Sequence, residues 1–133
     1  MEPICEQEHK ILELGTPNLA FVGDAVYELL TRTKIAQTKN QTSAKLHEIS
    51  VKKVCAKSQA LAYKFIVKFL TEKEQEILKR GRNYSGCRPP HNVSPIAYRK
   101  ATGVEVLFGY LFLIGEYARL EEIFLMIFEF LKT

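Results

Sequence analysis

Apolar residues recur at helical spacing along nearly the whole chain, and no stretch alternates between apolar and polar positions for the length of a strand. The segment 18–36 is a clear case, because four apolar residues three and four positions apart are predicted to face a core: Leu19, Val22, Val26 and Leu29. A break at Gly15-Thr16-Pro17-Asn18 precedes it, and Asn18 is the predicted N-cap. The pattern predicts an all-α fold.

Further helices are predicted on both sides of this segment. A short one covers residues 6–14, and a long helical region after the polar connection 37–42 has the apolar face Leu46, Ile49, Val54, Ala60, Leu61, Phe65 and Phe69. Thr71 and Glu74 form a capping box for a helix that ends near Arg82. Ser94-Pro95 starts a helix that continues to about Ile114, and residues 120–131 form the last one. We expect about six or seven helices in a single domain over residues 1–133.

The long irregular stretch, residues 83–94, lies in a block of about two dozen residues without Asp or Glu. Six cations fall in this block: Lys79, Arg80, Arg82, Arg88, Arg99 and Lys100. The overall charge of +4 is mild, so the local concentration is the more informative feature. Two interpretations remain open, a solvated basic loop and the binding surface for a polyanion.

Length and composition exclude several classes of protein. A chain of 133 residues that is 47% hydrophobic can bury one core, and no apolar run is long enough to span a membrane. The N-terminal sequence has no basic segment followed by an apolar one, so we expect a cytoplasmic protein. We interpret Cys5, Cys55 and Cys87 as reduced thiols, and the histidines do not stand at zinc-ligand spacing.

Two carboxylates in the helical segments need an explanation. Asp24 lies outside the apolar stripe with Glu28 one turn further on, and such a pair repels unless a cation lies nearby. Glu105 lies in the most apolar helix, where it can reach solvent, pair with Arg99, or bind a metal together with Asp24. Gly103 and Gly109 would let this helix approach another closely, conceivably the Asp24 helix, although ordinary tight packing is the alternative. Oxygen ligands from two helices suit Mg²⁺, and acidic groups beside a basic loop suggest phosphodiester hydrolysis.

Three segments together resemble a known family. Segment 19–28, LAFVGDAVYE, is similar to the signature helix of ribonuclease III catalytic domains. Segments 78–83, LKRGRN, and 98–113, YRKATGVEVLFGYLFL, resemble the short branch of that family, Mini-ribonuclease III, which lacks a double-stranded RNA-binding domain. The resemblance extends over residues 18–131.

The resemblance implies a helical homodimer that cleaves double-stranded RNA with Mg²⁺, associated in bacteria with maturation of the large-subunit (23S) ribosomal RNA precursor. It assigns catalysis and metal binding to Asp24 and Glu105. Phe21 matches an aromatic residue that inserts into the partner subunit, although an ordinary core position is the alternative. RNA contacts are implied for Lys79, Arg80, Arg82, Asn83 and Arg88, and a ribosomal protein is a conceivable helper.

The chain also departs from the larger relatives, which use four carboxylates. Ala20 and Thr102 stand at the two positions that are acidic there, so the number of metal ions per site stays open. Glu28 is either an auxiliary ligand or the partner of a lysine on its own helix. A catalytically silent module that binds structured RNA or a ribosomal particle is the main rival interpretation, and a helical protein-interaction domain is a more distant one.

Overall fold

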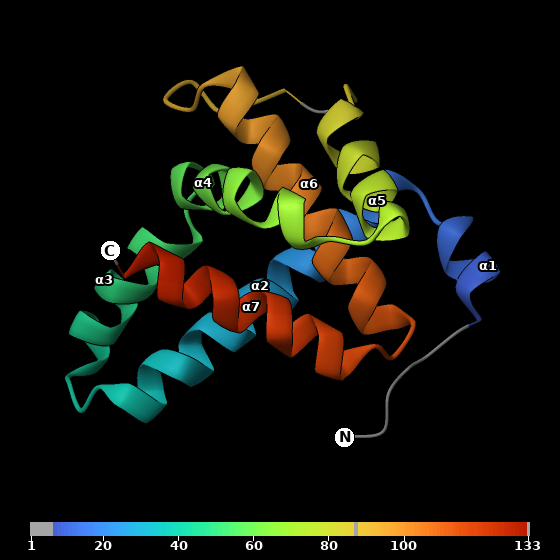
Figure 1. The fold of residues 1–133 in the computed structure, drawn as a ribbon. Helices are drawn as coiled ribbons and strands as arrows, with labels where there is room; N and C mark the ends of the chain where they lie inside the picture. Colours follow the sequence, from blue (N-terminus) through green and yellow to red (C-terminus); the bar gives the residue numbers. More distant parts are fainter. Residues whose placement is uncertain (1–6, 87, 133) are drawn as a thin grey trace.

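The computed structural model describes residues 7–86 and 88–132, which form helices joined by connections of different lengths (Figure 1). The elements are α1 (Glu8–Leu12), α2 (Thr16–Thr38), α3 (Ser43–Val54), α4 (Ala56–Ile66), the 3₁₀ helix η1 (Val67–Phe69), α5 (Glu72–Asn83), α6 (Pro95–Leu113) and α7 (Tyr117–Leu131). Within these ranges there is no strand and there are seven α-helices, which confirms the predicted all-α fold. Among the helices described, none is long and apolar enough to cross a membrane.

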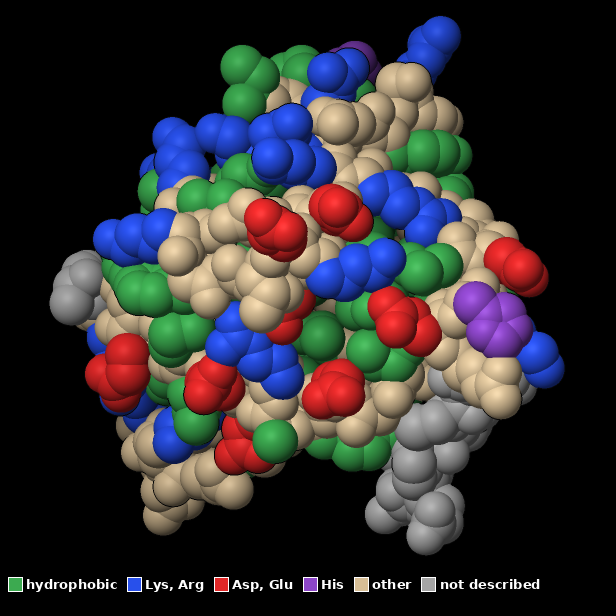
Figure 2. All heavy atoms as spheres, turned by 45° about the vertical axis from the view of Figure 1, so that its right-hand side comes forward, with side chains coloured by type: hydrophobic (Ala, Val, Ile, Leu, Met, Phe, Trp, Pro, Cys, Tyr) green, Lys and Arg blue, Asp and Glu red, His purple; other side chains and the backbone are tan. Residues whose placement is uncertain are grey.

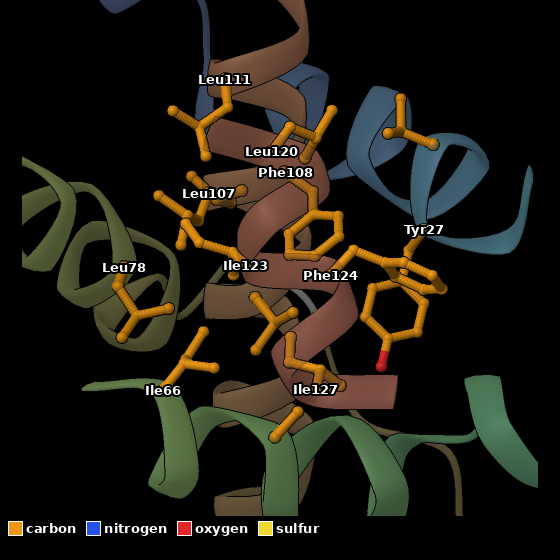
Figure 3. Close-up of a cluster of buried hydrophobic side chains, with 14 of the residues drawn as sticks. Tyr27, Ile66, Leu78, Leu107, Phe108, Leu111, Leu120, Ile123, Phe124 and Ile127 are labelled. Atoms are coloured by element: carbon orange, nitrogen blue, oxygen red, sulfur yellow. The ribbon is translucent and has the colours of Figure 1, made fainter. Parts of the chain in front are cut away.

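Helix α6 is the central element, and α2, α4 and α5 all pack against it (Figure 1). Its burial explains why its sequence is apolar on nearly every side. Phe108 of α6 contacts Tyr27 of α2 with ring centroids 5.1 Å apart, and Tyr27 in turn meets Phe124 of α7 at 6.1 Å (Figure 3). These aromatic contacts join three helices that are distant in sequence, so α6 is held on several sides at once.

The helix ends follow local signals closely, with one correction. Thr71 Oγ1 accepts from the Glu74 amide at 3.2 Å and Glu74 Oε1 accepts from the Thr71 amide at 2.9 Å, which confirms the capping box. Ser94 caps α6 as predicted. The N-cap of α2 is Gly15 rather than Asn18, because proline is tolerated in the first turn of a helix, where its missing N–H has no partner to lose.

The predicted apolar faces are partly wrong in α2 and in the region after residue 42. Leu29 is 59% exposed, whereas Tyr27 is 1% exposed, because α2 turns a different part of its surface toward α6 and α7. The long helical region is interrupted at Cys55, whose backbone is extended, and α4 therefore begins with a new orientation. Its buried face contains Tyr63 and Ile66, and Leu61 is exposed. Cys55 is a free, exposed thiol, whereas Cys5 and Cys87 lie outside the described residues.

Candidate active site

Two glycines bring the backbones of α2 and α6 into direct contact. A Cβ atom on Gly23 would lie 1.6 Å from the carbonyl oxygen of Glu105, and one on Gly109 would lie 2.0 Å from the carbonyl oxygen of Leu19. Of the two interpretations open for Gly109, close approach to the Asp24 helix is the one observed. Gly103 instead faces α5, where its Cβ would meet the Leu78 carbonyl oxygen at 2.8 Å. The crossing of α2 and α6 places Asp24, the neighbour of Gly23, beside Glu105.

Asp24 and Glu105 form a hydrogen-bonded pair of carboxyl groups at this crossing. Burial, together with the charge and the hydrogen bond of Asp24, raises the pKa of Glu105 to about 8. Of the three interpretations open for Glu105, contact with Asp24 is the one observed, and no ion pair with Arg99 occurs among the described residues. The two acids are thus neighbours in space although they are far apart in sequence.

The pair opens into a cavity of about 350 Å³ between α2, α6 and the start of the loop after α5. Its lining residues are Thr16, Pro17, Ala20, Phe21, Asp24, Tyr84, Tyr98, Thr102 and Glu105. Both positions that are acidic in larger relatives, Ala20 and Thr102, therefore face the same space as the two acids that remain. The Thr102 hydroxyl donates to the Tyr98 carbonyl oxygen at 2.9 Å, within its own helix.

Tyr84 and Tyr98 are cavity residues that were not singled out in the sequence. Tyr98 stands four residues before Thr102 and seven before Glu105, so helical spacing on α6 was a usable signal for it. Tyr84 lies just beyond the end of α5, and its place in the cavity depends on the fold of the following loop. No local pattern could have identified it.

The oxygen donors of this pair fit a hard divalent cation. Two adjacent carboxyl groups cannot both be ionised at low cost, and here the pair is held together by a hydrogen bond that needs a proton. A divalent cation can take the place of that proton, and Mg²⁺ needs only one or two protein carboxylates because it keeps several waters. Within the described ranges there is no group of three or more metal-binding side chains, so Asp24 and Glu105 would be the acidic ligands.

The residues expected to bind RNA differ in their exposure and in their hydrogen bonds. Lys79 and Arg88 are exposed. Arg82 is held in place, because it donates from Nη1 to the Tyr63 hydroxyl at 3.1 Å and from Nε to Asn83 Oδ1 at 3.2 Å. Both interactions leave its charge uncompensated.

Arg80 occupies a different environment from its neighbours. Its Nε donates to Thr16 Oγ1 at 3.0 Å, its Nη1 donates to the Leu12 carbonyl oxygen at 3.2 Å, and its Nη2 donates to the carbonyl oxygen of Leu14. All three nitrogens are thus directed at the connection between α1 and α2. The sequence does not predict this structural role, which ties α5 to a residue that lines the cavity.

Glu28 and Phe21 complete the set of candidate residues. Glu28 forms an ion pair with Arg32 at 2.8 Å, so its partner is a basic residue of its own helix, but an arginine rather than the expected lysine. Phe21 is 82% exposed, and its alternative interpretation as a core residue is therefore wrong. Contact with a second subunit stays a prediction for Phe21.

Comparison with known proteins places this arrangement in a family. The Ribonuclease III domain family matches residues 17–116. A protein named Mini-ribonuclease 3 from Thermoanaerobacter sp. (strain X514) is 50% identical over 113 residues, which cover 85% of this chain and 80% of the relative. The Mini-ribonuclease 3 of Staphylococcus aureus (strain NCTC 8325 / PS 47) is 36% identical over 118 residues, covering 87% and 88%.

A solved structure supports the same assignment at the level of the fold. The crystal structure of a protein from Fusobacterium nucleatum superposes with a TM-score of 0.81 at 27% sequence identity, covering 93% of this chain and 98% of that protein. The matching family extends over most of the chain and includes both cavity acids, Asp24 and Glu105. The chain therefore belongs to the ribonuclease III family, in its short Mini-ribonuclease III branch, and is an endoribonuclease.

Proposed function

We propose that this protein hydrolyses phosphodiester bonds of double-stranded RNA in a magnesium-dependent reaction, with Asp24 and Glu105 as the metal ligands and catalytic acids. The observation that carries the proposal is the hydrogen-bonded pair of carboxyl groups facing an open cavity in a member of this family. Most of the wall beside the pair is formed by side chains that cannot ligate Mg²⁺ strongly, such as Ala20 and Tyr98.

The two acids have different environments and hence different tasks. Glu105 is half-buried on the central helix, so its position is fixed by packing, whereas Asp24 is exposed and could hold a metal ion that also binds a substrate phosphate. Bound Mg²⁺ would activate a water molecule and stabilise negative charge on the phosphoryl group under attack. Ala20 and Thr102 leave space on the same wall for water ligands in place of the missing carboxylates.

We propose that the protein acts as a homodimer in which Phe21 inserts into the partner subunit. Phe21 is exposed and borders a cavity of about 580 Å³ whose wall includes Leu29, Phe112 and Tyr117. An exposed aromatic beside an apolar hollow on the same surface is what a two-fold symmetric contact requires, since each subunit can supply both the ring and its receptor. A dimer of this kind would present two sites to one duplex.

The remaining parts of the proposal follow from the family and the charge pattern. We propose the precursor of 23S ribosomal RNA as the substrate, a cytoplasmic location, a single catalytic domain over residues 1–133 and, as an optional helper, a ribosomal protein that presents the RNA. Lys79, Arg82, Asn83 and Arg88 are proposed to contact the RNA backbone, because duplex RNA is read mainly through its phosphates and 2′-hydroxyls. Arg80 contributes to the same region by holding the chain in place.

A cleavage assay with a matched control tests the central proposal. The unmutated protein, Asp24→Asn and Glu28→Gln are incubated with a double-stranded RNA, with and without Mg²⁺. Glu28 is an acid on the same helix that is paired with Arg32, so its variant controls for the loss of one negative charge. We expect cleavage by the unmutated protein and Glu28→Gln only when Mg²⁺ is present, and none by Asp24→Asn.

The other outcomes separate the rival functions. Binding of RNA without cleavage by the unmutated protein would identify a silent RNA-binding module. Absence of binding even at low salt would favour a protein-interaction domain.

A further inference from the structure

Two cations meet at the ring of Tyr63, and a third lies beside one of them. Arg82 of α5 donates to the Tyr63 hydroxyl at 3.1 Å, and the Lys100 Nζ of α6 lies 6.0 Å from the centre of the Tyr63 ring. The Lys64 ammonium of α4 is within hydrogen-bonding reach of Lys100. We call Lys64, Arg82 and Lys100 the basic triad.

Close packing of α5 and α6 determines this arrangement. A Cβ atom on Gly81 would lie 2.7 Å from the Cα of Gly103, and one on Gly103 would lie 3.2 Å from Cε2 of Tyr63. Because neither glycine has a side chain, the helices that carry Arg82 and Lys100 come close to each other and to Tyr63 of α4. The three members of the triad are thus carried by packed helices rather than by surface loops.

The positive charge of the triad is not balanced by the protein. In the described part of the chain none of its three members forms an ion pair, although other cations do, such as Arg32 with Glu28 and Lys45 with Glu48. Burial lowers the pKa of Lys100, and the charges of Lys64 and Arg82 lower it further. Such mutual repulsion is unfavourable, and an anion bound between the three groups would remove it.

Positive and negative side chains are unevenly distributed over the surface of the protein. In Figure 2, Lys and Arg side chains gather at the upper left of the face shown, whereas Asp and Glu lie across its middle and lower parts. A polyanion binds such a group of cations more tightly than a small ion does, because it contacts several of them together.

We propose that the basic triad is a binding site for backbone phosphate of the RNA substrate, outside the cavity that holds Asp24 and Glu105. The inference rests on the proposed function and deepens it, since it joins Lys64 of α4 with Arg82 and Lys100 of the basic block in one site. The fixed fork of Arg82 and the two ammonium groups together offer N–H donors from several directions, which suits the tetrahedral oxygens of a phosphate.

The triad positions the RNA strand and takes no part in bond cleavage. Lys100 and Glu105 are five residues apart on α6, which is about 7.5 Å along the helix axis. Gly103, which faces Tyr63 and α5, and Glu105, which faces α2, lie on opposite sides of α6. A strand held at the triad must therefore pass the end of α6 to reach the two acids.

Salt dependence of RNA binding tests this site directly. Binding of a fluorescently labelled double-stranded RNA is measured by anisotropy at a series of NaCl concentrations, with EDTA present so that nothing is cleaved. For Lys64→Gln with Lys100→Gln we expect weaker binding, and a slope of log Kd against log salt that is smaller by about one per lysine, or about two in total. Lys64→Arg with Lys100→Arg should restore both quantities.

A charge-matched control separates local contact from general attraction. Lys45→Gln with Lys52→Gln removes two positive charges from α3, where both lysines lie near Glu48, at 3.7 and 3.9 Å. We expect this variant to keep the slope of the unmutated protein, and circular dichroism verifies that all variants are folded. An unchanged slope in the Lys64 and Lys100 variant, or an equal loss in the control, would overturn the site.

Cleavage by the unmutated protein, measured in parallel with Mg²⁺, shows which proposal fails. If the unmutated protein cleaves the duplex while Lys64→Gln with Lys100→Gln keeps the unmutated slope of log Kd against log salt, the triad is refuted and the proposed function stands. If it neither binds nor cleaves the duplex, the proposed function fails and the triad fails with it.

Discussion

Gly23→Ala is the most direct test of how the fold brings Asp24 and Glu105 together in the candidate active site. The added Cβ would lie 1.6 Å from the carbonyl oxygen of Glu105, where ordinary contact begins at 3.4 Å. The atom it meets belongs to the backbone of the central helix and cannot rotate away. Helices α2 and α6 must therefore separate by well over 1 Å at the very position where Asp24 and Glu105 meet.

The expected magnitudes follow from this displacement. Forcing extra volume into a packed contact costs about 1–3 kcal/mol or more, and the better helix propensity of alanine returns about 1 kcal/mol. We expect a net loss of roughly 2 kcal/mol, which for a domain of this size corresponds to a Tm lower by about 6–10 °C. A misplacement of about 1 Å can reduce catalysis by about 10²-fold, so kcat should fall by at least that factor.

Thermal unfolding by circular dichroism and single-turnover cleavage of double-stranded RNA measure the two effects. Gly15→Ala is the control, because its Cβ would find only ordinary contacts, such as Asn18 Oδ1 at 3.4 Å. It should stay within about 1 kcal/mol of the unmutated protein and keep its activity. If Gly23→Ala retained both its Tm and its cleavage rate, the backbone contact would not determine the site, and the reasoning would be refuted.

Three further variants test other features. Phe21→Ser should raise the dimer Kd by about 10³-fold, since two rings lose about 2 kcal/mol of burial each, whereas Ile96→Ser should not; light scattering after gel filtration measures both. Glu74→Gln should lower the free energy of unfolding by about 2 kcal/mol at neutral pH. Burial alone would raise the pKa of Glu74, but hydrogen bonds from Arg119 and the Thr71 amide lower it overall. The contribution of Glu74 is therefore full above its ordinary pKa and disappears as pH falls through the lowered one, so urea titrations of the two proteins should converge in acid. Arg80→Ala should lower stability by about 3 kcal/mol yet keep the salt dependence of RNA binding, and a reduced salt slope would show that Arg80 contacts phosphate instead.

Local signals in the sequence were sufficient for some elements and not for others. The capping box at Thr71 and the start of α6 at Ser94 are set by neighbouring residues, so they could be predicted. The break at Cys55 has no proline or glycine to mark it, and the helical pattern runs through it without interruption. The exposure of Leu29 likewise depends on how α2 is rotated against α6, which periodicity alone does not fix.

The candidate site shows the same division. The pairing of Asp24 with Glu105 could be predicted because both residues match family segments, and Gly109 indicated a close helix crossing. The resemblance implied an RNA contact for Arg80. Charge along the chain does not reveal that the guanidinium of Arg80 turns inward to backbone carbonyls. Arg82 and Lys100 already belonged to the basic block, but their meeting with Lys64 could not be predicted, since Lys64 is far from them in sequence and joins them only after α4 packs on α6.

The backbone contact between α2 and α6 also has a consequence for motions of the native protein. An element at the edge, such as α1, can open and close without separating the two helices that carry the acids. We expect amide hydrogens of α2 and α6 around Gly23 and Gly109 to exchange only through global unfolding, and those of α1 to exchange through local opening. Motions at the edge of the domain would then leave the pair of Asp24 and Glu105 intact until the whole domain unfolds.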